Sequence, residues 1–371
     1  MRFLVSPCAY KGTLSPWQLA VAIADGIRDA APDSSIVIAP IADGGDGTLD
    51  ALHGAIGGEF KYLEVRGPVD NPVRAKWLNL GDSAVVELAN ASGLALLPGN
   101  KLCALEAHTF GLGQVILNAL ETNPKNLFIC VGGSASTDGG AGALMALGAK
   151  FYDIDGSLIG MGGGQLCDVR TCDLSQLDKF FKTIGISSIK VAVDVINPLL
   201  GDNGAAAVFG PQKGAGILEV ARLDHCLAHF AQVLENATGR NLVNAPGAGA
   251  AGGTAFGIAT ALGAELISGF LWLADVLNLE EKIAASDVVI SAEGSLDSQS
   301  ISGKAIGELA KLCAKYDKPL WAFPAVAEEN MDWAASGIHK LVATSGNGVL
   351  ADEKAVRLTV SKAMTKWSAV F

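Results

Sequence analysis

The sequence is poor in charged and aromatic residues, and its charge has the wrong sign for a nucleic-acid binder. Only 18% of the 371 residues are charged and 6% are aromatic, and 38 acidic side chains outnumber 27 basic ones, which gives a net charge of −11. A protein that follows a phosphate backbone needs clustered Lys and Arg. We therefore expect no nucleic acid as a partner, although backbone N–H groups and single lysines can still bind a small anion.

Paired cysteines and long apolar runs are also missing. The seven cysteines are scattered, odd in number and free of any C-x-x-C pair, so zinc is not expected, and buried or free thiols in a reducing compartment are the better interpretation. The uncharged stretch Asn241–Ala264 is rich in Gly and Ala, which favours a loop and a packed helix over a membrane span. Arg2–Ser6 is predicted to be a strand and not part of a signal peptide. We expect a cytoplasmic protein that does not enter a membrane.

Several catalytic signatures are absent. The chain has no G-x-x-x-x-G-K-[ST], no H-R-D or D-F-G and no G-x-S-x-G, which excludes a P-loop NTPase, a protein kinase and a nucleophile-elbow hydrolase. Nor do the five histidines form an H-E-x-x-H motif, and His225 and His229 are predicted to share a helix face instead of holding a metal. Phosphate chemistry with carboxylates, lysines and backbone amides is what these exclusions leave.

Short apolar runs that alternate with helical patterns indicate an α/β protein. Continuous Val, Ile and Leu runs such as Leu127–Val131 and Asp287–Ser291 are typical of strands buried on both faces of a parallel sheet. Glu59–Leu88 differs, because turn signals divide it into runs that predict antiparallel strands. We predict a Rossmann-like or flavodoxin-like domain from residues 1–60 and 282–371, with a second α/β domain, residues 61–281, inserted in the middle of the chain.

The chain has 45 glycines, and most of the informative ones gather where predicted strands meet helices. Lys11 and Gly12 follow the first strand, so the lysine could meet a phosphate as a point charge, or it could be solvated beside a capped helix. The turns 42–48 and 137–142 share the sequence Asp-Gly-Gly, which presents amides to an anion. Their carboxylates, Asp43, Asp46 and Asp138, could hold Mg²⁺, orient a hydroxyl or accept its proton, or they could simply make Asx turns.

Four further clusters offer the same chemistry. Gly132–Ser136 follows a strand and suits a carboxylate or phosphate, and Asp194 stands at a strand end ahead of Lys213. Residues 247–252 form a G-x-G-x-x-G without a convincing strand before it, so they could clasp nucleotide phosphates or serve only tight packing, and NAD binding by an oxidoreductase is the weaker rival. Residues 293–304 add carboxylates, hydroxyls and Lys304.

Eight ordered motifs, which span nearly the whole chain, resemble those of the type-1 glycerate kinase family. They are Tyr10–Ser15, Ala42–Thr48, Ala91–Leu94, Gly132–Gly140, Asp194–Leu199, Val208–Ala215, Pro246–Gly253 and Asp297–Ser300. The resemblance implies two α/β domains and ATP-dependent phosphorylation of D-glycerate with Mg²⁺, at the 2-hydroxyl to give 2-phosphoglycerate. Phosphorylation at the 3-hydroxyl and a catalytically weakened glycerate-binding regulator are the alternatives. A monomer or homodimer is expected.

Roles for individual residues follow from this resemblance. Asp194 or Asp43 would orient or deprotonate the hydroxyl, with Lys11 as a further catalytic residue or as a ligand of the substrate carboxylate, and Mg²⁺ would sit on one or two of Asp43, Asp138 and Asp297. The predicted substrate-binding residues are Gly132, Gly133, Ser134, Ser136, Asp138 and Asn197. Those predicted to bind nucleotide or phosphate are Lys213, Gly247, Gly249, Gly252, Ser298, Gln299 and Lys304.

The sequence departs from the family pattern at three places. Pro7-Cys8-Ala9-Tyr10 replaces a motif that carries a carboxylate at the end of the first strand. A basic residue usual in the late motif is replaced by Ser295-Leu296, and a glycine-bearing turn by Pro324-Ala325-Val326.

Overall fold

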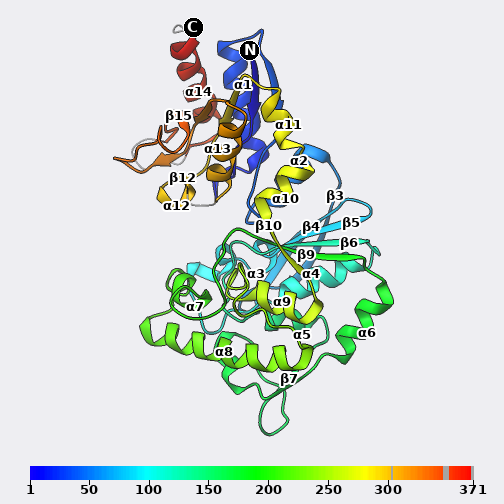
Figure 1. Cartoon of the computed structure of the whole chain (residues 1–371). Helices are drawn as coiled ribbons and strands as arrows, with labels where there is room; N and C mark the ends of the chain where they lie inside the picture. The colour runs from blue at the N-terminus through cyan, green and yellow to red at the C-terminus, as the bar shows by residue number, and fades with distance from the viewer. Residues whose placement is uncertain (302–303, 346–350, 369–371) are drawn as a thin grey trace. The chain divides into compact units, whose positions relative to one another are not determined.

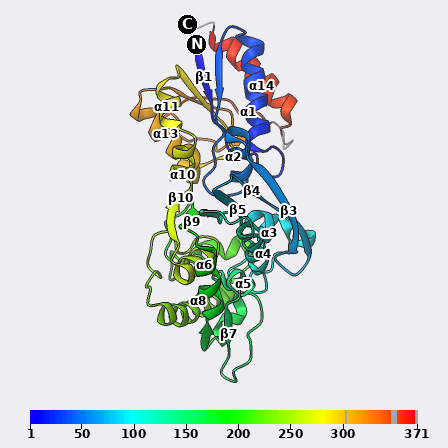
Figure 2. The same cartoon turned by 90° about the vertical axis from the view of Figure 1, so that its right-hand side faces the viewer.

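The fold was analysed in a computed structural model that describes residues 1–301, 304–345 and 351–368. Within this range Gln299, Ile301 and Ser368 are described by their backbone alone. The sequence also predicts a helix over Gly303–Lys315, with Ser302 as its N-cap, but Ser302 and Gly303 lie outside the described residues. Figures 1 and 2 show the chain in two views.

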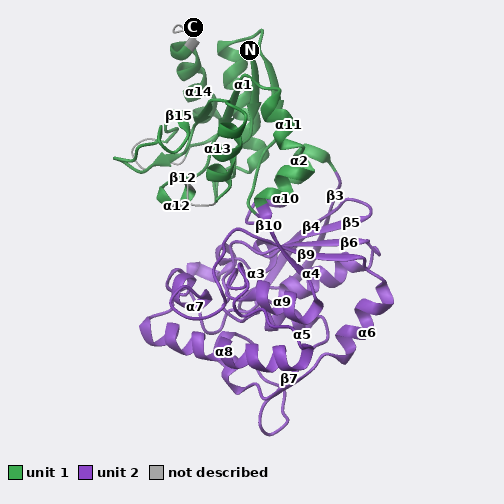
Figure 3. Cartoon of the chain, viewed as in Figure 1, with its two compact units in different colours: residues 1–43, 50–57, 270–371 green, residues 44–49, 58–269 purple. Residues whose placement is uncertain are grey.

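The chain forms two compact units (Figure 3). Unit 1 contains residues 1–43, 50–57 and 270–371, and unit 2 contains residues 44–49 and 58–269. These limits differ from the boundaries expected at residues 60 and 282. Residues 279–284 belong to unit 1 because their helix packs against another helix of that unit. Residues 44–49 belong to unit 2, where a buried carboxylate binds their backbone.

Unit 1 is built on a parallel five-stranded sheet in the order β15-β13-β11-β1-β2. Numbered along the chain, this is the 2-1-3-4-5 order of flavodoxin-like folds. The predicted α/β class is therefore confirmed. The strands are β1 (Arg2–Val5), β2 (Ser35–Ile38), β11 (Val288–Ser291), β13 (Leu320–Ala322) and β15 (Ile338–Leu341), and a small parallel pair joins β12 (Ser295–Leu296) to β14 (Val326–Ala327).

The helices of unit 1 begin with strong local signals. Ser15 accepts the N–H of Gln18, whose side chain in turn accepts the N–H of Ser15, and Pro16 occupies the first helical position. Helix α1 packs against α14, and both cover a core that includes Ile23, Trp321 and Val360. The helices are α1 (Pro16–Ala30), α2 (Thr48–Ile56, which begins in unit 2), α10 (Gly269–Val276), α11 (Leu279–Ala284), α12 (Ser298–Ile301), α13 (Ala305–Lys315) and α14 (Glu353–Ser368).

Unit 2 contains a mixed six-stranded sheet in the order β10-β9-β6-β5-β4-β3. Strands β5, β6, β9 and β10 are parallel, whereas β3, β4 and β5 pair antiparallel, as the turn-rich sequence after residue 59 indicates. The strands are β3 (Glu59–Arg66), β4 (Pro72–Asn79), β5 (Ser83–Glu87), β6 (Asn126–Cys130), β9 (Ser188–Val193) and β10 (Glu265–Ser268), and β7 (Lys150–Tyr152) forms a hairpin with β8 (Thr171–Asp173).

Helices cover the sheet of unit 2 and enclose its core. Trp77, Phe151, Phe230 and Phe256 are fully buried there. The α-helices are α3 (Ala89–Ser92), α4 (Phe110–Leu120), α5 (Ala141–Ala146), α6 (Ser175–Ile184), α7 (Ala205–Phe209), α8 (Ile217–Thr238) and α9 (Thr254–Leu262), and 3₁₀ turns cover Leu94–Leu96, Pro98–Asn100, Gly163–Asp168 and Pro211–Lys213. As expected, 241–264 is a loop and a packed helix. Across the described ranges, no helix is both long and apolar enough to cross a bilayer.

One expectation about the cysteines is corrected by the structure. Cys167 and Cys226 form a disulfide, while the other five cysteines are free thiols. The 3₁₀ turn Gly163–Asp168 packs along α8, which brings two residues 59 positions apart in sequence side by side. Scattered cysteines without a spacing motif carry no signal for such a pair.

Glycines allow backbone to pack on backbone in unit 2. A Cβ atom built on Gly257, in α9, would lie 2.0 Å from the carbonyl oxygen of Gly139, and one on Gly252 would lie 2.2 Å from that of Ser136. No side chain fits at these distances without a shift of the main chain. The glycine excess of the sequence is therefore required, in part, by contacts between loops.

We expect Gly257→Ala to lower the free energy of unfolding by about 2 kcal/mol or more, because the added methyl group overlaps the backbone of Gly139. The matched control is Gly160→Ala, where the nearest atom would be 3.5 Å from the new Cβ. Urea unfolding of both variants checks this. Equal midpoints for the two variants would contradict the assigned packing.

Candidate functional site

The predicted site residues of unit 2 follow the carboxyl ends of neighbouring parallel strands. In the register of β6 and β9, Cys130 pairs with Ala192. Gly132 and Asp194 each come two residues later, so the turn at Gly132 and the carboxylate of Asp194 follow at the same level of the sheet. Neighbouring strands lie about 4.8 Å apart. The fold thus places a carboxylate beside a glycine turn at the edge where α/β proteins bind ligands.

Lys213 holds the turn after β6 from inside the protein. Its side chain is only 2% exposed, and its Nζ donates to Ser134 Oγ at 2.7 Å and to the carbonyl oxygen of Ser136 at 2.5 Å. Burial lowers the pKa of Lys213 to about 7, an effect that nearby Asp138 opposes. An ammonium group has three donors, so one N–H remains for a further acceptor.

Asp138 is buried and bound by several donors. Its Oδ2 accepts the N–H and the hydroxyl of Thr109, both at 2.8 Å, and the N–H of Gly142 at 3.1 Å, while Oδ1 accepts the N–H of Gly140 at 3.2 Å. These contacts fix the start of α5. The predicted roles of Asp138 in substrate and metal binding stay predictions, and its saturated Oδ2 does not favour them.

Glu87 is a site residue that the sequence analysis missed. It ends β5, is 1% exposed, and accepts the N–H groups of Gly47 at 3.3 Å and Leu49 at 3.1 Å. Burial, together with Asp46, raises the pKa of Glu87 to about 8 against the effect of these N–H groups and of Lys76. In the sequence, Glu87 ends an apolar run four residues before Ala91, a position that carries no distinctive signal.

The loop of residues 247–253 packs tightly against protein. Cβ atoms on Gly247 and Gly249 would meet Val193 Cγ2 at 2.8 Å and the carbonyl oxygen of Pro198 at 2.3 Å. The N–H of Gly249 donates to Asn197 O, and Asn197 Nδ2 donates to Asn203 O. Of the two interpretations left open, these contacts support tight packing. Their contact with a nucleotide, and substrate binding by Asn197, stay predictions.

The predicted residues of unit 1 gather where its strand order reverses, between β1 and β11. Cys8 donates its N–H to Ala292 O, and Glu293 is the next residue. Burial raises the pKa of Glu293 to about 7, and its Oε1 is buried without a hydrogen-bond partner. Burial, together with Glu293 and Asp43, raises the pKa of the Cys8 thiol, and Lys11 acts in the opposite direction. The side chains of Cys8, Lys11, Asp43 and Glu293 are thus close enough to interact electrostatically.

The late motif lies beside this group. Asp297 Oδ1 accepts the N–H of Ser300 at 2.9 Å. Lys304 lowers the pKa of Glu293, whereas Asp297 raises it. The N–H of Ser298 donates to Glu328 Oε2. Because Glu293 titrates near neutrality, this group could exchange a proton with a substrate hydroxyl. Among the described residues, no set of three or more His, Cys, Asp or Glu side chains is arranged to hold a metal alone.

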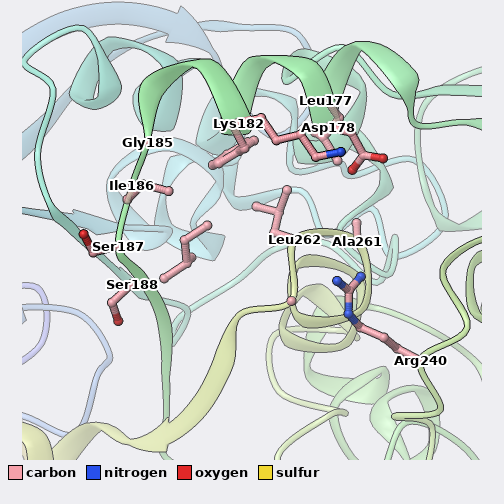
Figure 4. A pocket seen from close by; sticks show the side chains of 13 residues that line it. Leu177, Asp178, Lys182, Gly185, Ile186, Ser187, Ser188, Arg240, Ala261 and Leu262 are labelled. Carbon is pink, nitrogen blue, oxygen red and sulfur yellow. The ribbon is translucent and has the colours of Figure 1, made fainter.

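A cavity in unit 2 lies away from these groups (Figure 4). Its volume is about 410 Å³, and Lys182, Ser188, Arg240 and Leu262 are among the residues that line it. Ser188 begins β9, whereas Asp194 follows the other end of the same strand. This cavity is therefore at the amino end of the strand and does not coincide with the candidate site.

Parallel sheets whose carboxyl ends carry glycine turns, lysines and carboxylates are typical of α/β enzymes that act on phosphate-bearing substrates. The sequence profile described as "Glycerate kinase family" matches residues 3–363. The chain belongs to this family.

Individual relatives agree with this assignment. The chain is 44% identical over 322 residues to the "Glycerate 2-kinase" of Escherichia coli (strain K12), with 86% of this chain and 84% of that protein covered. It is 40% identical over 322 residues to the "Glycerate kinase" of Bacillus subtilis (strain 168), with the same coverage. A crystal structure of "putative glycerate kinase 2" from Salmonella typhimurium LT2 has a TM-score of 0.83 and 35% identity, and covers 100% of this chain and 99% of its own.

The buried Lys213 predicts a particular pH dependence of stability. Unfolding raises its pKa from about 7 to the ordinary value of about 10.4, so the unfolded chain binds one more proton between these values and stability rises with pH. Lys213→Met removes this contribution. We expect the free energy of unfolding of the original protein to gain about 2 kcal/mol over that of the variant between pH 7 and pH 9.

Urea unfolding at the two pH values measures this gain. Lys182→Met, which removes an exposed lysine of α6, is the control and should show no such change. A constant difference between the original protein and Lys213→Met would mean that Lys213 is already charged in the folded protein at pH 9.

Proposed function

We propose that this protein transfers the γ-phosphate of ATP to the 2-hydroxyl of D-glycerate and gives 2-phosphoglycerate. The observation that carries the proposal is the register of β6 and β9, which brings the glycine turn and Asp194 to the same level of one sheet edge. Membership of the glycerate kinase family and the named activity of the Escherichia coli relative support it.

The turn after β6 is suited to the carboxylate of glycerate. The N–H of Gly132 donates to Gly44 O, and the described contacts leave the N–H groups of Gly133 and Ser134 for an anion. Gly133 has a φ of +77°, a conformation that turns successive N–H groups toward one side. Lys213 stiffens this turn through Ser134 and Ser136, which then contribute to substrate binding by their position. Lys11 is the alternative partner for the carboxylate.

Asp194 is our candidate for the group that orients or deprotonates the hydroxyl, with Asp43 as the alternative. Asp194 follows β9 directly, so its backbone is held by the sheet. Lys213, through its remaining N–H, and Lys304 would contact the transferring phosphate, and Gly247, Gly249, Gly252, Ser298 and Gln299 would line the nucleotide. Little covalent chemistry is required of the protein, because phosphoryl transfer depends on position and charge.

Magnesium is proposed on Asp43 and Asp297. In kinases this ion is held by one or two carboxylates together with substrate phosphates, which fits a chain whose described residues have no site with three such ligands. When bound, the ion neutralises charge on the transferring phosphate. Asp138 is the weaker candidate because its Oδ2 already has three donors.

A cytoplasmic location is proposed because ATP is available there, and five of the seven cysteines are free thiols. The disulfide is unusual for that compartment.

The reaction itself is tested by incubation with D-glycerate, ATP and Mg²⁺, with ADP release measured by a coupled assay. We expect turnover, and ³¹P NMR of the product should show 2-phosphoglycerate. A 3-phosphoglycerate signal would move the reaction to the other hydroxyl. Glycerate binding without ADP release by folded protein would favour the regulator instead.

Asp194→Asn tests the assigned base. We expect kcat to fall about 10²- to 10⁴-fold with little change in KM, because proton transfer to a positioned carboxylate contributes a factor of this size. Asp202→Asn, in the same loop and exposed, is the matched control. If Asp194→Asn keeps the original kcat, the role passes to Asp43, and Asp43→Asn should then show the loss.

A further inference from the structure

The turn of residues 44–49 lies across the carboxyl ends of three strands of unit 2. The N–H of Gly132, after β6, donates to Gly44 O at 3.1 Å. A Cβ atom on Gly44 would lie 3.0 Å from the carbonyl oxygen of Ala192, in β9, and one on Gly132 would lie 2.4 Å from Gly45 Cα. Glu87, at the end of β5, supplies the third contact. The turn is therefore in backbone contact with β9 and with the turn after β6, and in side-chain contact with β5.

Glu87 binds the part of the turn that leads into α2. Its Oε1 accepts the N–H of Gly47, and its Oε2 accepts that of Leu49, which is in the first turn of α2. Asn90 Nδ2 donates to the same Oε1 at 2.9 Å and so orients the carboxyl group. Thr48 closes the turn internally, because its N–H and hydroxyl both donate to Gly45 O. The carboxyl group of Glu87 thus binds the residues on both sides of Thr48.

Asp46 lies within this turn, and Asp43 precedes it. A side chain on a glycine-rich turn has a defined position only if the turn is fixed by its surroundings, since glycine itself restricts the backbone least. Gly44 and Gly47 both have positive φ values, of +91° and +94°, which glycine adopts without strain, so contacts with the surroundings and not the backbone's own preference hold the turn in this conformation. The bonds from Gly47 and Leu49 to Glu87 are among those contacts.

We propose that Glu87 is a positioning residue for the phosphoryl transfer, which fixes the turn 44–49 and with it the carboxylate of Asp46 and the main chain that contacts Gly132. This rests on the proposed function. Glu87 contacts neither reacting atoms nor a metal in this assignment; it acts through the main chain of the turn. Asn90 supports it by orienting the carboxyl group.

Glu87→Gln tests the proposal with the smallest possible change. Glutamine has the same size and keeps one acceptor, but its NH₂ group cannot accept, so either Gly47 or Leu49 loses its partner. We expect kcat to fall about 10-fold or more with KM within about 3-fold, because a displaced catalytic group slows the chemical step more than it weakens binding. Asn90→Ala, at a half-buried position, should show a smaller loss in the same direction.

Hydrogen exchange provides a readout that is independent of activity. In Glu87→Gln, the peptides that cover residues 44–49 should exchange several-fold faster than in the original protein, while β6 and β9 remain unchanged. Trp77→Phe is the control. The substitution removes the hydrogen bond from Trp77 Nε1 to Asn118 Oδ1. Trp77 is buried on β4 opposite Val86 of β5, and this bond does not involve the turn 44–49. Trp77→Phe should leave both kcat and the exchange of residues 44–49 as they are.

The outcomes separate this proposal from the proposed function. Faster exchange of the turn with full kcat in Glu87→Gln would reduce Glu87 to a structural role, and unchanged exchange would overturn the proposal at its base. If the original protein has no activity with glycerate and ATP, the proposed function fails by itself. The exchange experiment would still report whether Glu87 holds the turn. If Glu87→Gln does not fold, Asn90→Ala gives the same two measurements.

Discussion

The proposed active site depends on close contact between main chains at the carboxyl edge of the unit 2 sheet. The turn 44–49 meets the turn after β6 at Gly132, and the loop of residues 247–253 meets the turn that contains Gly139. Each loop is short and glycine-rich, so none has enough side chain of its own to form a stable structure. Their conformations are defined by one another, and a disturbance in one is expected to reach the others.

Buried polar side chains complete this arrangement. Glu87, Asp138 and Lys213 are each almost fully buried, and each one binds backbone or hydroxyl groups of a glycine-containing turn. Removing a charged group from water costs several kcal/mol unless its hydrogen bonds are replaced. The pKa values of Glu87 and Lys213 are both shifted toward the neutral form, which reduces that cost. The protein thus uses these groups as hydrogen-bonding partners for the main chain and for neighbouring hydroxyl groups.

The α/β class, most of the strands and the start of α1 could be predicted from the sequence, because apolar runs and capping residues act locally. Glu87 could not be recognised in the same way. A glutamate at the end of an apolar run has no distinctive local pattern, and its partners at Gly47 and Leu49 are about 40 residues away in the chain. The disulfide was missed for the same reason. The glycines of residues 247–253 were correctly singled out, but sequence alone could not distinguish contact with a ligand from contact with Asn197, Pro198 and Ser136.

Contact between two main chains also limits how this protein can change over time. A bulky side chain in a core can be accommodated when its neighbour becomes smaller, so the two positions can exchange volume. Gly257 faces a carbonyl group of Gly139, and Gly132 faces the Cα of Gly45. In both cases the neighbouring atom belongs to the main chain, so no smaller side chain can make room. A second substitution cannot compensate for the first at these places. We expect relatives that keep these loops to keep the glycines, and designed libraries to find no pairwise replacements there.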